Sequence, residues 1–397
     1  MVVLPKIKGF ICTTAHPLGC AQNVLDQIKL VQSGGPIKGK SGKALIIGSS
    51  NGFGLSTRIT LAFGLNCPTM GVFYEKPPSP GRTATAGYYN TVALEAELNK
   101  AGLFAQSFNL DAFTSNAKER VISEIKEKWG QVDYLIYSLA APRRTDPIDG
   151  QTYKSALKTQ GESLTSKTIN SQTGEIYQIT IPAAEPEDIL GTIKVMGGED
   201  WKLWVEALQA ANCLAPEFVT MAYSYVGPEL TQQIYRKGCI GEAKKHLEAT
   251  TRELNQILAP YKGKAYISVN KALVTLSSAA IPVMSLYITL LYKAMRDLKL
   301  HEGCIEQIIR LFRTKFFGAT GPELDGEGLI RMDDWELQPE VQKVVEKLFA
   351  DVTTENVNSI ASVADFNNEF LRLFGFGIKG VDYDADVNIE PENSFIS

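Results

Sequence analysis

The sequence predicts an α/β fold, a doubly wound parallel sheet with an N-terminal extension, an active-site insertion and added C-terminal helices. Two observations support this prediction. A short apolar run, 43–47, ends in a glycine-rich turn and continues directly into a helix-compatible segment, 55–63. Strand and helix patterns then alternate as far as residue 140. That alternation is typical of a parallel sheet whose strands are joined by right-handed helical crossovers.

Composition excludes several classes of function. The chain has 397 residues, of which 44% are hydrophobic and 21% charged, with a net charge of −4. The chain has no block of like charges, so nothing in its charge pattern indicates nucleic-acid binding. Six scattered cysteines and three histidines form no metal-ligand pattern, so we expect no metal site and reduced thiols. The N-terminus lacks the basic start and long apolar core of a signal peptide, and the longest apolar stretch, 279–291, is too short to span a bilayer. We therefore expect a cytoplasmic protein with no membrane partner.

We expect one large domain over residues 1–397. Residues 1–42 form an N-terminal extension, too small to fold alone, with a short strand over Lys6–Cys12 and a helical period from Asn23 to Val31. Residues 43–275 form the core, with an insertion at about 142–196. Residues 276–397 supply substrate-pocket helices and a C-terminal extension.

The glycine-rich turn has the spacing Gly48-x-x-x-Gly52-x-Gly54, which is found in short-chain dehydrogenases. Glycine permits positive φ and lets a ligand approach the backbone closely. The helix that follows directs free N–H groups at negative charge, an arrangement that binds a pyrophosphate. Alone, the triplet is equally compatible with an ordinary strand-to-helix turn.

The next strand, Pro68–Glu75, ends on an acid. Glu75 lies 21 positions after Gly54, where an acid accepts hydrogen bonds from the adenosine ribose hydroxyls of a dinucleotide. A carboxylate there repels a 2′-phosphate, so NADH is favoured over NADPH. The alternative is a solvated loop acid, and the nearby Lys76 and Arg82 would soften the exclusion of NADPH.

Two further strands complete the predicted cofactor site. Phe104–Ala112 closes on Asp111-Ala112, a pair suited to an adenine edge, and a helix over Lys118–Trp129 follows. The strand that starts at Val132 ends in small residues, which leave room for a cofactor ribose. Together these patterns indicate a Rossmann-like, dinucleotide-binding sheet.

The insertion is predicted to hold a strand at Glu175–Ile181 near the active site. It leads to a helix over Trp201–Ala211, for which Asp200 is the expected N-cap. Later, Lys271–Thr275 closes the expected last parallel strand. Ser277–Tyr292 is expected as an apolar helix, broken by Pro282, that lines an acyl pocket or simply fills the core. The expected C-terminal helices are Cys304–Phe317, Gln338–Leu348 and Phe366–Phe374.

Tyr235 and Lys244 are the candidate catalytic residues. They are nine positions apart, which on one straight helix is about 900° of rotation and leaves them on opposite sides. Gly238 and Gly241 supply a break, so we expect a helix from Gly241 to about Ile257 with Tyr235 on the preceding turn. The alternative is a rim tyrosine and a solvated lysine.

The order Tyr225, Tyr235, Lys244 resembles the trans-2-enoyl-CoA and enoyl-acyl-carrier-protein reductases of the larger Y-x8-K type. Similar stretches run through the whole chain: Ala15–Cys20, Gly48–Gly54, Tyr137–Asp146, Val195–Trp201, Ser268–Thr275, His301–Gln307 and Gly380–Val387.

This resemblance implies NADH-dependent reduction of the 2,3 double bond of an enoyl thioester of acyl-carrier protein or CoA. It implies that Tyr235 donates to the enolate oxygen, that Lys244 binds the cofactor and that Tyr225 contacts the substrate carbonyl. The remaining implied cofactor residues are Gly48, Ser49, Ser50, Asn51, Gly52, Phe53, Tyr74, Glu75, Asp111, Ala112, Leu139, Ala140, Leu273, Val274 and Thr275. The extensions would cover surfaces through which smaller relatives tetramerise, which favours a monomer.

Two rival functions share this cofactor site. A short-chain carbonyl reductase would prefer the Y-x-x-x-K spacing, which is absent around Tyr235. A non-catalytic NADH-binding regulator would keep the glycine loop and could lose Tyr235 or Lys244, yet both are present.

Overall fold

The structure is a computed structural model that describes residues 1–9, 11–281 and 283–397. Its centre is a seven-stranded sheet with the order β13-β12-β11-β6-β3-β4-β5, and every adjacent pair of strands is parallel. The strands are β3 (Ala44–Ile47), β4 (Thr69–Phe73), β5 (Ala105–Asn109), β6 (Val132–Tyr137), β11 (Leu214–Ser224), β12 (Lys264–Val269) and β13 (Ile330–Arg331). The predicted Rossmann-like parallel sheet is confirmed.

The strand order reverses at β3. Its neighbours are β4 on one side and β6 on the other, so crossovers leave the first strand in opposite directions. All four residues of β3 are buried, which fits its uninterrupted apolar sequence, because a central parallel strand is covered on both faces. A crevice opens at the carboxyl end of such a switch point, where α/β proteins bind their ligands.

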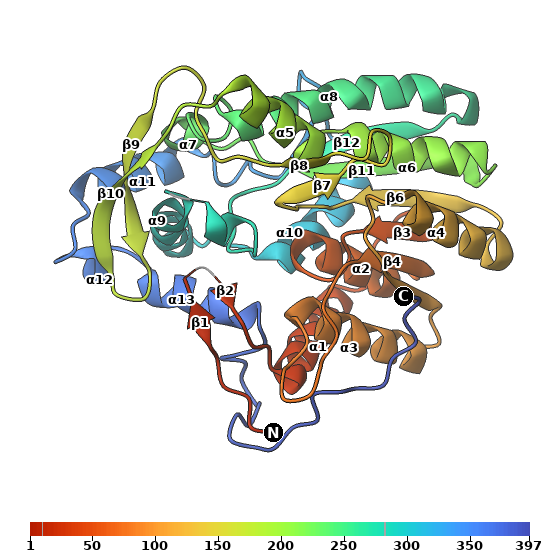
Figure 1. Ribbon diagram of the computed structural model, residues 1–397, viewed down its shortest axis with the longest axis horizontal. Helices are drawn as coiled ribbons and strands as arrows, with labels where there is room; N and C mark the ends of the chain where they lie inside the picture. Colours follow the sequence, from red (N-terminus) through yellow and green to blue (C-terminus); the bar gives the residue numbers. More distant parts are fainter. Residues whose placement is uncertain (10, 282) are drawn as a thin grey trace.

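Helices cover both faces of the sheet (Figure 1). On one face, α4 (Ser115–Lys128), α6 (Glu199–Ala210) and α8 (Cys239–Leu258) contribute to one apolar cluster with the strands. On the other face lie α2 (Gly52–Leu65), α3 (Ala86–Lys100) and α1 (Pro17–Ser33), which pack together. The helix α10 (Cys304–Arg310), continued by a π-helix over Leu311–Phe316, joins them there. The sheet is therefore doubly wound.

The N-terminal extension differs in detail from its prediction. Instead of one short strand over Lys6–Cys12, two short strands, β1 (Ile7–Lys8) and β2 (Ile11–Cys12), pair antiparallel, and Phe10 lies outside the described residues. The helix α1 begins six residues before the expected Asn23. It starts there because Pro17 suits the first helical position and the His16 imidazole Nδ1 accepts a hydrogen bond from the Gly19 N–H at 3.1 Å.

The insertion holds two antiparallel hairpins and a helix. The hairpins are β7 (Arg143–Thr145) with β8 (Thr152–Lys154), and β9 (Leu164–Asn170) with β10 (Glu175–Ile181), and the helix is α5 (Pro186–Met196). The strand predicted at Glu175–Ile181 is confirmed as β10.

The prediction that Asp200 caps the next helix is wrong. Helix α6 begins at Glu199, with Gly198 at the N-cap position. Asp200 is buried and accepts hydrogen bonds from Lys118 Nζ at 2.7 Å and from Tyr137 Oη at 3.0 Å. A buried carboxylate requires charged or hydrogen-bonding partners. Because Lys118 supplies one from α4 and Tyr137 another from β6, the Asp200 carboxylate links these two elements to α6.

In the C-terminal part, the structure differs from the predicted last strand and from one predicted helix. The strand before Lys271 is not the last of the sheet, because β13 adds to the edge beside β12. The predicted helix Ser277–Tyr292 is a short 3-10 turn over Ser278–Ala280 followed by α9 (Met284–Asp297), and its predicted break at Pro282 lies outside the described residues. Then come α11 (Pro339–Asp351), α12 (Val357–Ile360) and α13 (Val363–Arg372). Within the described ranges no helix combines the length and apolar character needed to cross a membrane.

Candidate active site

The glycine-rich loop after β3 is closely packed against the end of β6. Gly48 has φ +84°, and a Cβ there would lie 2.2 Å from the carbonyl oxygen of Ser138. A Cβ on Gly54 would lie 1.9 Å from the carbonyl oxygen of Gly48. Both positions therefore require glycine, and the loop presents bare backbone at the crevice.

The first turn of α2 is open to a ligand. Asn51 is its N-cap residue, but the Asn51 side chain makes no capping hydrogen bond. The amide instead donates to Glu75 Oε1 at 3.0 Å. The N–H groups of the first turn therefore remain available for negative charge, which fits the diphosphate of a dinucleotide.

Glu75 is anchored to that same loop. Its Oε1 also accepts from Ser50 Oγ at 2.7 Å, and burial raises the pKa of its carboxyl group. The Asn109 side chain makes two hydrogen bonds with the Glu75 backbone. The Glu75 N–H donates to Asn109 Oδ1 at 2.8 Å, and Asn109 Nδ2 donates to the Glu75 carbonyl at 3.0 Å. The carboxylate is thus not a free loop acid, which disfavours the solvated alternative.

Asn90 supports the glycine loop from α3 and was missed by the sequence analysis. Its Nδ2 donates to the Ser50 carbonyl at 3.1 Å and to Asn51 Oδ1 at 2.9 Å. An asparagine inside a helix belongs to no motif, so its role was visible only once α3 and the loop lay side by side.

The other predicted cofactor residues lie around the carboxyl edge of the sheet. Tyr74 follows β4 and is 76% exposed, Asp111 and Ala112 follow β5, and Leu139 and Ala140 follow β6. Ala112 is buried, and its carbonyl accepts from Lys118 Nζ at 3.0 Å and Trp204 Nε1 at 3.2 Å.

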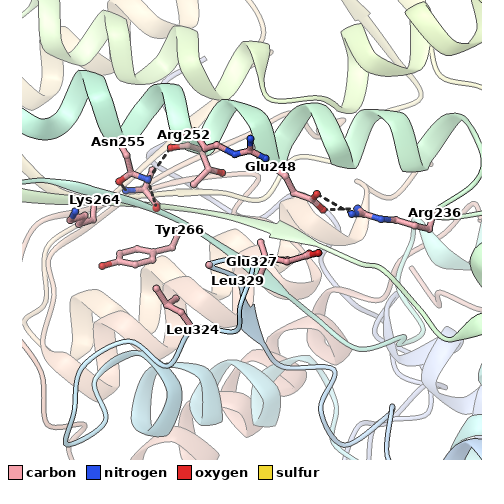
Figure 2. A pocket seen from close by; sticks show the side chains of 12 residues that line it. Arg236, Glu248, Arg252, Asn255, Lys264, Tyr266, Leu324, Glu327 and Leu329 are labelled. Atoms are coloured by element: carbon pink, nitrogen blue, oxygen red, sulfur yellow. Dashed lines mark hydrogen bonds and ion pairs between the residues drawn. The ribbon is translucent and has the colours of Figure 1, made fainter.

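One cavity joins the two ends of the predicted cofactor site. It has a volume of about 370 Å³, and its lining includes Asn51 and Gly52 from the loop together with Leu273 and Val274. Thr275 turns away to hydrogen-bond Ser278. A second cavity, of about 640 Å³, runs along α8 and contains none of the predicted cofactor residues (Figure 2).

Tyr235 and Lys244 sit on either side of the predicted backbone break. Tyr235 lies on the turn between α7 (Glu229–Gln232) and α8, and α8 begins at Cys239, close to the expected start. A Cβ on Gly241 would lie 2.2 Å from the Arg236 carbonyl oxygen and 2.3 Å from that of Tyr235. Only a glycine lets the turn fold this tightly onto the first turn of α8.

Lys244 projects from α8 toward the end of β11. Its Nζ donates to the Tyr223 carbonyl at 3.5 Å, and burial lowers the pKa of its amine to about 8. The Tyr223 hydroxyl hydrogen-bonds Thr57 Oγ1 at 2.5 Å. Lys244 is therefore a half-buried amine next to the strand that leads to Tyr225.

Tyr225 and Tyr235 meet edge to face, with ring centroids 4.6 Å apart and an interplanar angle of 77°. The Tyr225 hydroxyl donates to Glu336 Oε1 at 3.0 Å. Among the described residues the Tyr235 hydroxyl has no hydrogen-bond partner, although its side chain is 7% exposed. Burial, and then the charge of Glu336, raise the pKa of the Tyr235 phenol, so it stays protonated at neutral pH.

Glu336, from the C-terminal extension, was also missed by the sequence analysis. It is fully buried, and its carboxylate additionally accepts from Tyr287 Oη at 2.6 Å and from the Ala272 N–H at 2.7 Å. It stands about a hundred residues after Tyr235 in a segment with no motif, so no sequence signal placed it here.

Comparison with known proteins assigns the family. The profile described as the trans-2-enoyl-CoA reductase catalytic region matches residues 82–317, and that of the NAD(P)H binding domain of trans-2-enoyl-CoA reductase matches residues 2–80. The chain belongs to the trans-2-enoyl-CoA reductase family. The resemblance inferred from the sequence motifs is thereby confirmed.

Members of this family match over nearly the whole chain. An enoyl-[acyl-carrier-protein] reductase [NADH] of Flavobacterium johnsoniae is 52% identical over 388 residues, 98% of each chain. A trans-2-enoyl-CoA reductase [NADH] of Ruminiclostridium cellulolyticum is 47% identical over 390 residues, again 98% of each chain. The crystal structure of Treponema denticola trans-2-enoyl-CoA reductase in complex with NAD has a TM-score of 0.95 and 42% identity, and it covers 99% of this chain and 100% of that one.

A third profile, described as an enoyl reductase FAD binding domain, matches residues 324–387. The structure describes this segment in full, and it contains no strand–glycine loop–helix unit for a flavin diphosphate. Its buried apolar residues, among them Val341, Val345 and Phe366, pack into the same cluster as α9. These residues do not fit a flavin, and we assign no step to one.

Proposed function

We propose that this chain catalyses NADH-dependent reduction of the 2,3 double bond of trans-2-enoyl thioesters to saturated acyl thioesters, the last reductive step of fatty acid elongation. The observation that carries the proposal is the match, over 98% of the chain, to reductases named for NADH and for enoyl thioesters. The arrangement of Tyr235, Tyr225 and Lys244 supports it.

The residues of the glycine loop would hold the cofactor. Backbone N–H groups from Gly52 onward would bind the diphosphate, and Glu75 would accept hydrogen bonds from the adenosine ribose. Leu273 and Val274 line the other end of the shared cavity, where the nicotinamide belongs in this proposal. When bound, NADH supplies the hydride that C3 of the substrate receives.

Tyr235 acts on the substrate oxygen. As negative charge develops on the thioester oxygen, the phenol donates a hydrogen bond to it and stabilises the enolate. A proton then adds at C2, and the enolate becomes the saturated acyl thioester. The Tyr235 hydroxyl has no hydrogen-bond partner in the part of the chain that the structure describes, and its pKa is raised. Both observations support this role, since a protonated donor is needed at neutral pH. Lys244 contributes positive charge beside the cofactor, and Tyr225 shapes the wall against which the thioester carbonyl lies.

An apolar cavity beside α9 supports the acyl pocket. It has a volume of about 340 Å³ and is lined in part by Ile169, Ala279, Phe366 and Phe370. These four residues belong to the same apolar cluster as Tyr235. An acyl chain that enters this cavity would lie among residues of the apolar cluster that also contains Tyr235.

We further propose a thioester carrier, a cellular location and assembly state, a domain organisation and a cofactor preference. The thioester carrier is acyl-carrier protein or CoA, since relatives of similar identity bear both names. We propose that the protein is cytoplasmic and monomeric, and sedimentation analysis of the purified chain tests the monomeric state. The chain is one domain, with the extension 1–42, the core 43–275 and the helices 276–397, because one apolar cluster includes residues from Val3 to Ile389. NADH is preferred to NADPH because of Glu75.

One assay separates this function from its rivals. NADH oxidation is measured with crotonyl-CoA and, in parallel, with acetoacetyl-CoA, which offers a ketone and no 2,3 double bond. We expect rapid turnover with crotonyl-CoA alone. Turnover with acetoacetyl-CoA alone would indicate the carbonyl reductase, and NADH binding without any turnover would indicate the regulator.

A further inference from the structure

The carboxylate of Glu336 holds together three separate segments of the active site. Its Oε1 accepts from Tyr225 Oη at the end of β11 and from Tyr287 Oη on α9, at 3.0 and 2.6 Å. Its Oε2 accepts from the Ala272 N–H at 2.7 Å, directly before Leu273. The strand end, the apolar helix and the segment at the nicotinamide end therefore share one anchor.

Burial raises the pKa of the Glu336 carboxyl group, and its hydrogen-bond donors and the charge of Lys271 oppose that rise. All three of its partners are donors, and the fully buried Lys271 lies on the same loop as Ala272. Gln342 Nε2 reinforces the arrangement, because it donates to the Glu336 carbonyl at 2.6 Å and to Tyr287 Oη at 3.3 Å. A buried acceptor with this many donors is costly to disturb.

The hydrogen bond to Glu336 gives the two adjacent tyrosines different roles. The single hydroxyl proton of Tyr225 is directed at Glu336, whereas the Tyr235 hydroxyl has no partner among the described residues. Because the two rings are in edge-to-face contact, the orientation of Tyr225 fixes the surface against which Tyr235 packs. If Tyr225 were released, both hydroxyls would compete for the same substrate oxygen.

We propose that Glu336 is a positioning residue for the reaction: it holds Tyr225 and the Ala272 backbone in place so that Tyr235 alone presents a proton to the substrate. This inference rests on the proposed enoyl thioester reduction. It assigns a role to the C-terminal extension, which supplies part of the active-site framework from outside the nucleotide-binding sheet.

The test compares full-length wild type, Glu336→Gln and a matched control, Asp333→Asn, with NADH and crotonyl-CoA. Asp333 is equally buried in the same segment, but its carboxylate pairs with Arg331 at 2.6 and 2.8 Å. We expect Glu336→Gln to lower kcat by about tenfold or more, because hydrogen bonds to a charged acceptor are lost. We expect KM for NADH to change by less than about threefold. Asp333→Asn should lower the Tm and leave kcat within about twofold of wild type.

A double-mutant cycle with Tyr225→Phe shows whether Glu336 acts through Tyr225. In the Tyr225→Phe background, Glu336→Gln should reduce kcat much less than it does in wild type, because the shared contact is already gone. Full additivity, or a kcat for Glu336→Gln equal to that of Asp333→Asn, would overturn the proposal. An inactive wild type would overturn the proposed function itself and this inference with it.

Tyr287→Phe provides a second route if Glu336→Gln does not fold. It removes one of the two bonds to Oε1 and leaves the carboxylate in place. We expect kcat to fall by about threefold or more and the Tm to fall as well, because one buried hydrogen bond to the carboxylate is lost. A kcat equal to wild type would overturn the positioning role.

Discussion

Arg236 and Glu248 join the turn that carries Tyr235 to the helix that carries Lys244. Arg236 Nη1 donates to Glu248 Oε1 at 2.6 Å, and Nη2 donates to Oε2 at 3.1 Å. Figure 2 draws both side chains and the interaction between them. Arg236 directly follows Tyr235, and Glu248 lies four positions, about one helical turn, after Lys244. This bidentate pair fixes the turn relative to α8, and with it the spacing of the two proposed functional side chains.

We predict that Arg236→Gln lowers kcat by about tenfold, because the turn loses its fixed position relative to α8. The measurement is steady-state NADH oxidation together with the Tm. Lys202→Gln is the matched control, since Lys202 also pairs with an acid of α8, Glu253, at 2.7 Å, but on α6 and away from Tyr235. Equal kcat values for the two variants would argue against the role of Arg236.

Gly241→Ala is predicted to disrupt the same turn sterically. The added Cβ would lie 2.2 and 2.3 Å from two backbone carbonyl oxygens, so the turn with Tyr235 must move. We expect a lower Tm and a kcat reduced by about tenfold or more. Gly326→Ala is the control, because no atom lies within 4 Å of a Cβ there and its φ is not positive. A Gly241→Ala enzyme with wild-type kcat would show that the close packing does not matter.

Glu75→Gln is predicted to change the choice of cofactor. The amide keeps the shape of the side chain but removes the charge that opposes a 2′-phosphate. We expect the ratio of kcat/KM for NADPH to that for NADH to rise by about tenfold. Asp111→Asn, at the predicted adenine edge, should change both cofactors equally. An unaltered ratio in Glu75→Gln would mean that another group excludes NADPH.

The amine of Lys244 predicts an alkaline limb in the pH profile. Burial lowers its pKa from 10.5 to about 8, so the amine is almost fully charged well below that pH and loses its charge as the pH rises through it. We expect kcat/KM for NADH to fall above about pH 8, because kcat/KM reports the free enzyme. In Lys244→Arg, whose guanidinium stays charged, this limb should disappear even if the overall rate is lower. An identical limb in wild type and Lys244→Arg would assign it to another group.

The fold was predictable because its signals are local. The glycine loop, the apolar strands and the helix start after Gly238 each depend on residues close in sequence, and each lies near the expected place. The errors occur where tertiary contacts decide. Asp200 looked like a cap but is held inside α6 by Lys118 and Tyr137, and β13 has only two residues, too few for a recognisable pattern.

The residues that hold the site in place, Asn90 and Glu336, were not predictable, because their contacts also depend on the tertiary fold. Asn90 and Glu336 bind backbone or side-chain atoms brought close only by the tertiary fold. An isolated polar residue in a helix or loop gives no periodic signal, and its partner lies tens to hundreds of residues away. The spacing of Tyr235 and Lys244 did predict a break, but the ion pair that fixes it, Arg236–Glu248, is visible only in the structure.

NADH oxidation with crotonyl-CoA, by wild type and by Tyr235→Phe, shows directly whether the Tyr235 phenol stabilises the enolate. The variant removes one hydroxyl that has no partner among the described residues, so the fold and NADH binding should be preserved. We predict that kcat falls by about a hundredfold or more, because the developing enolate loses its donor. Wild-type turnover by Tyr235→Phe would show that the phenol of Tyr235 is not the donor to the enolate.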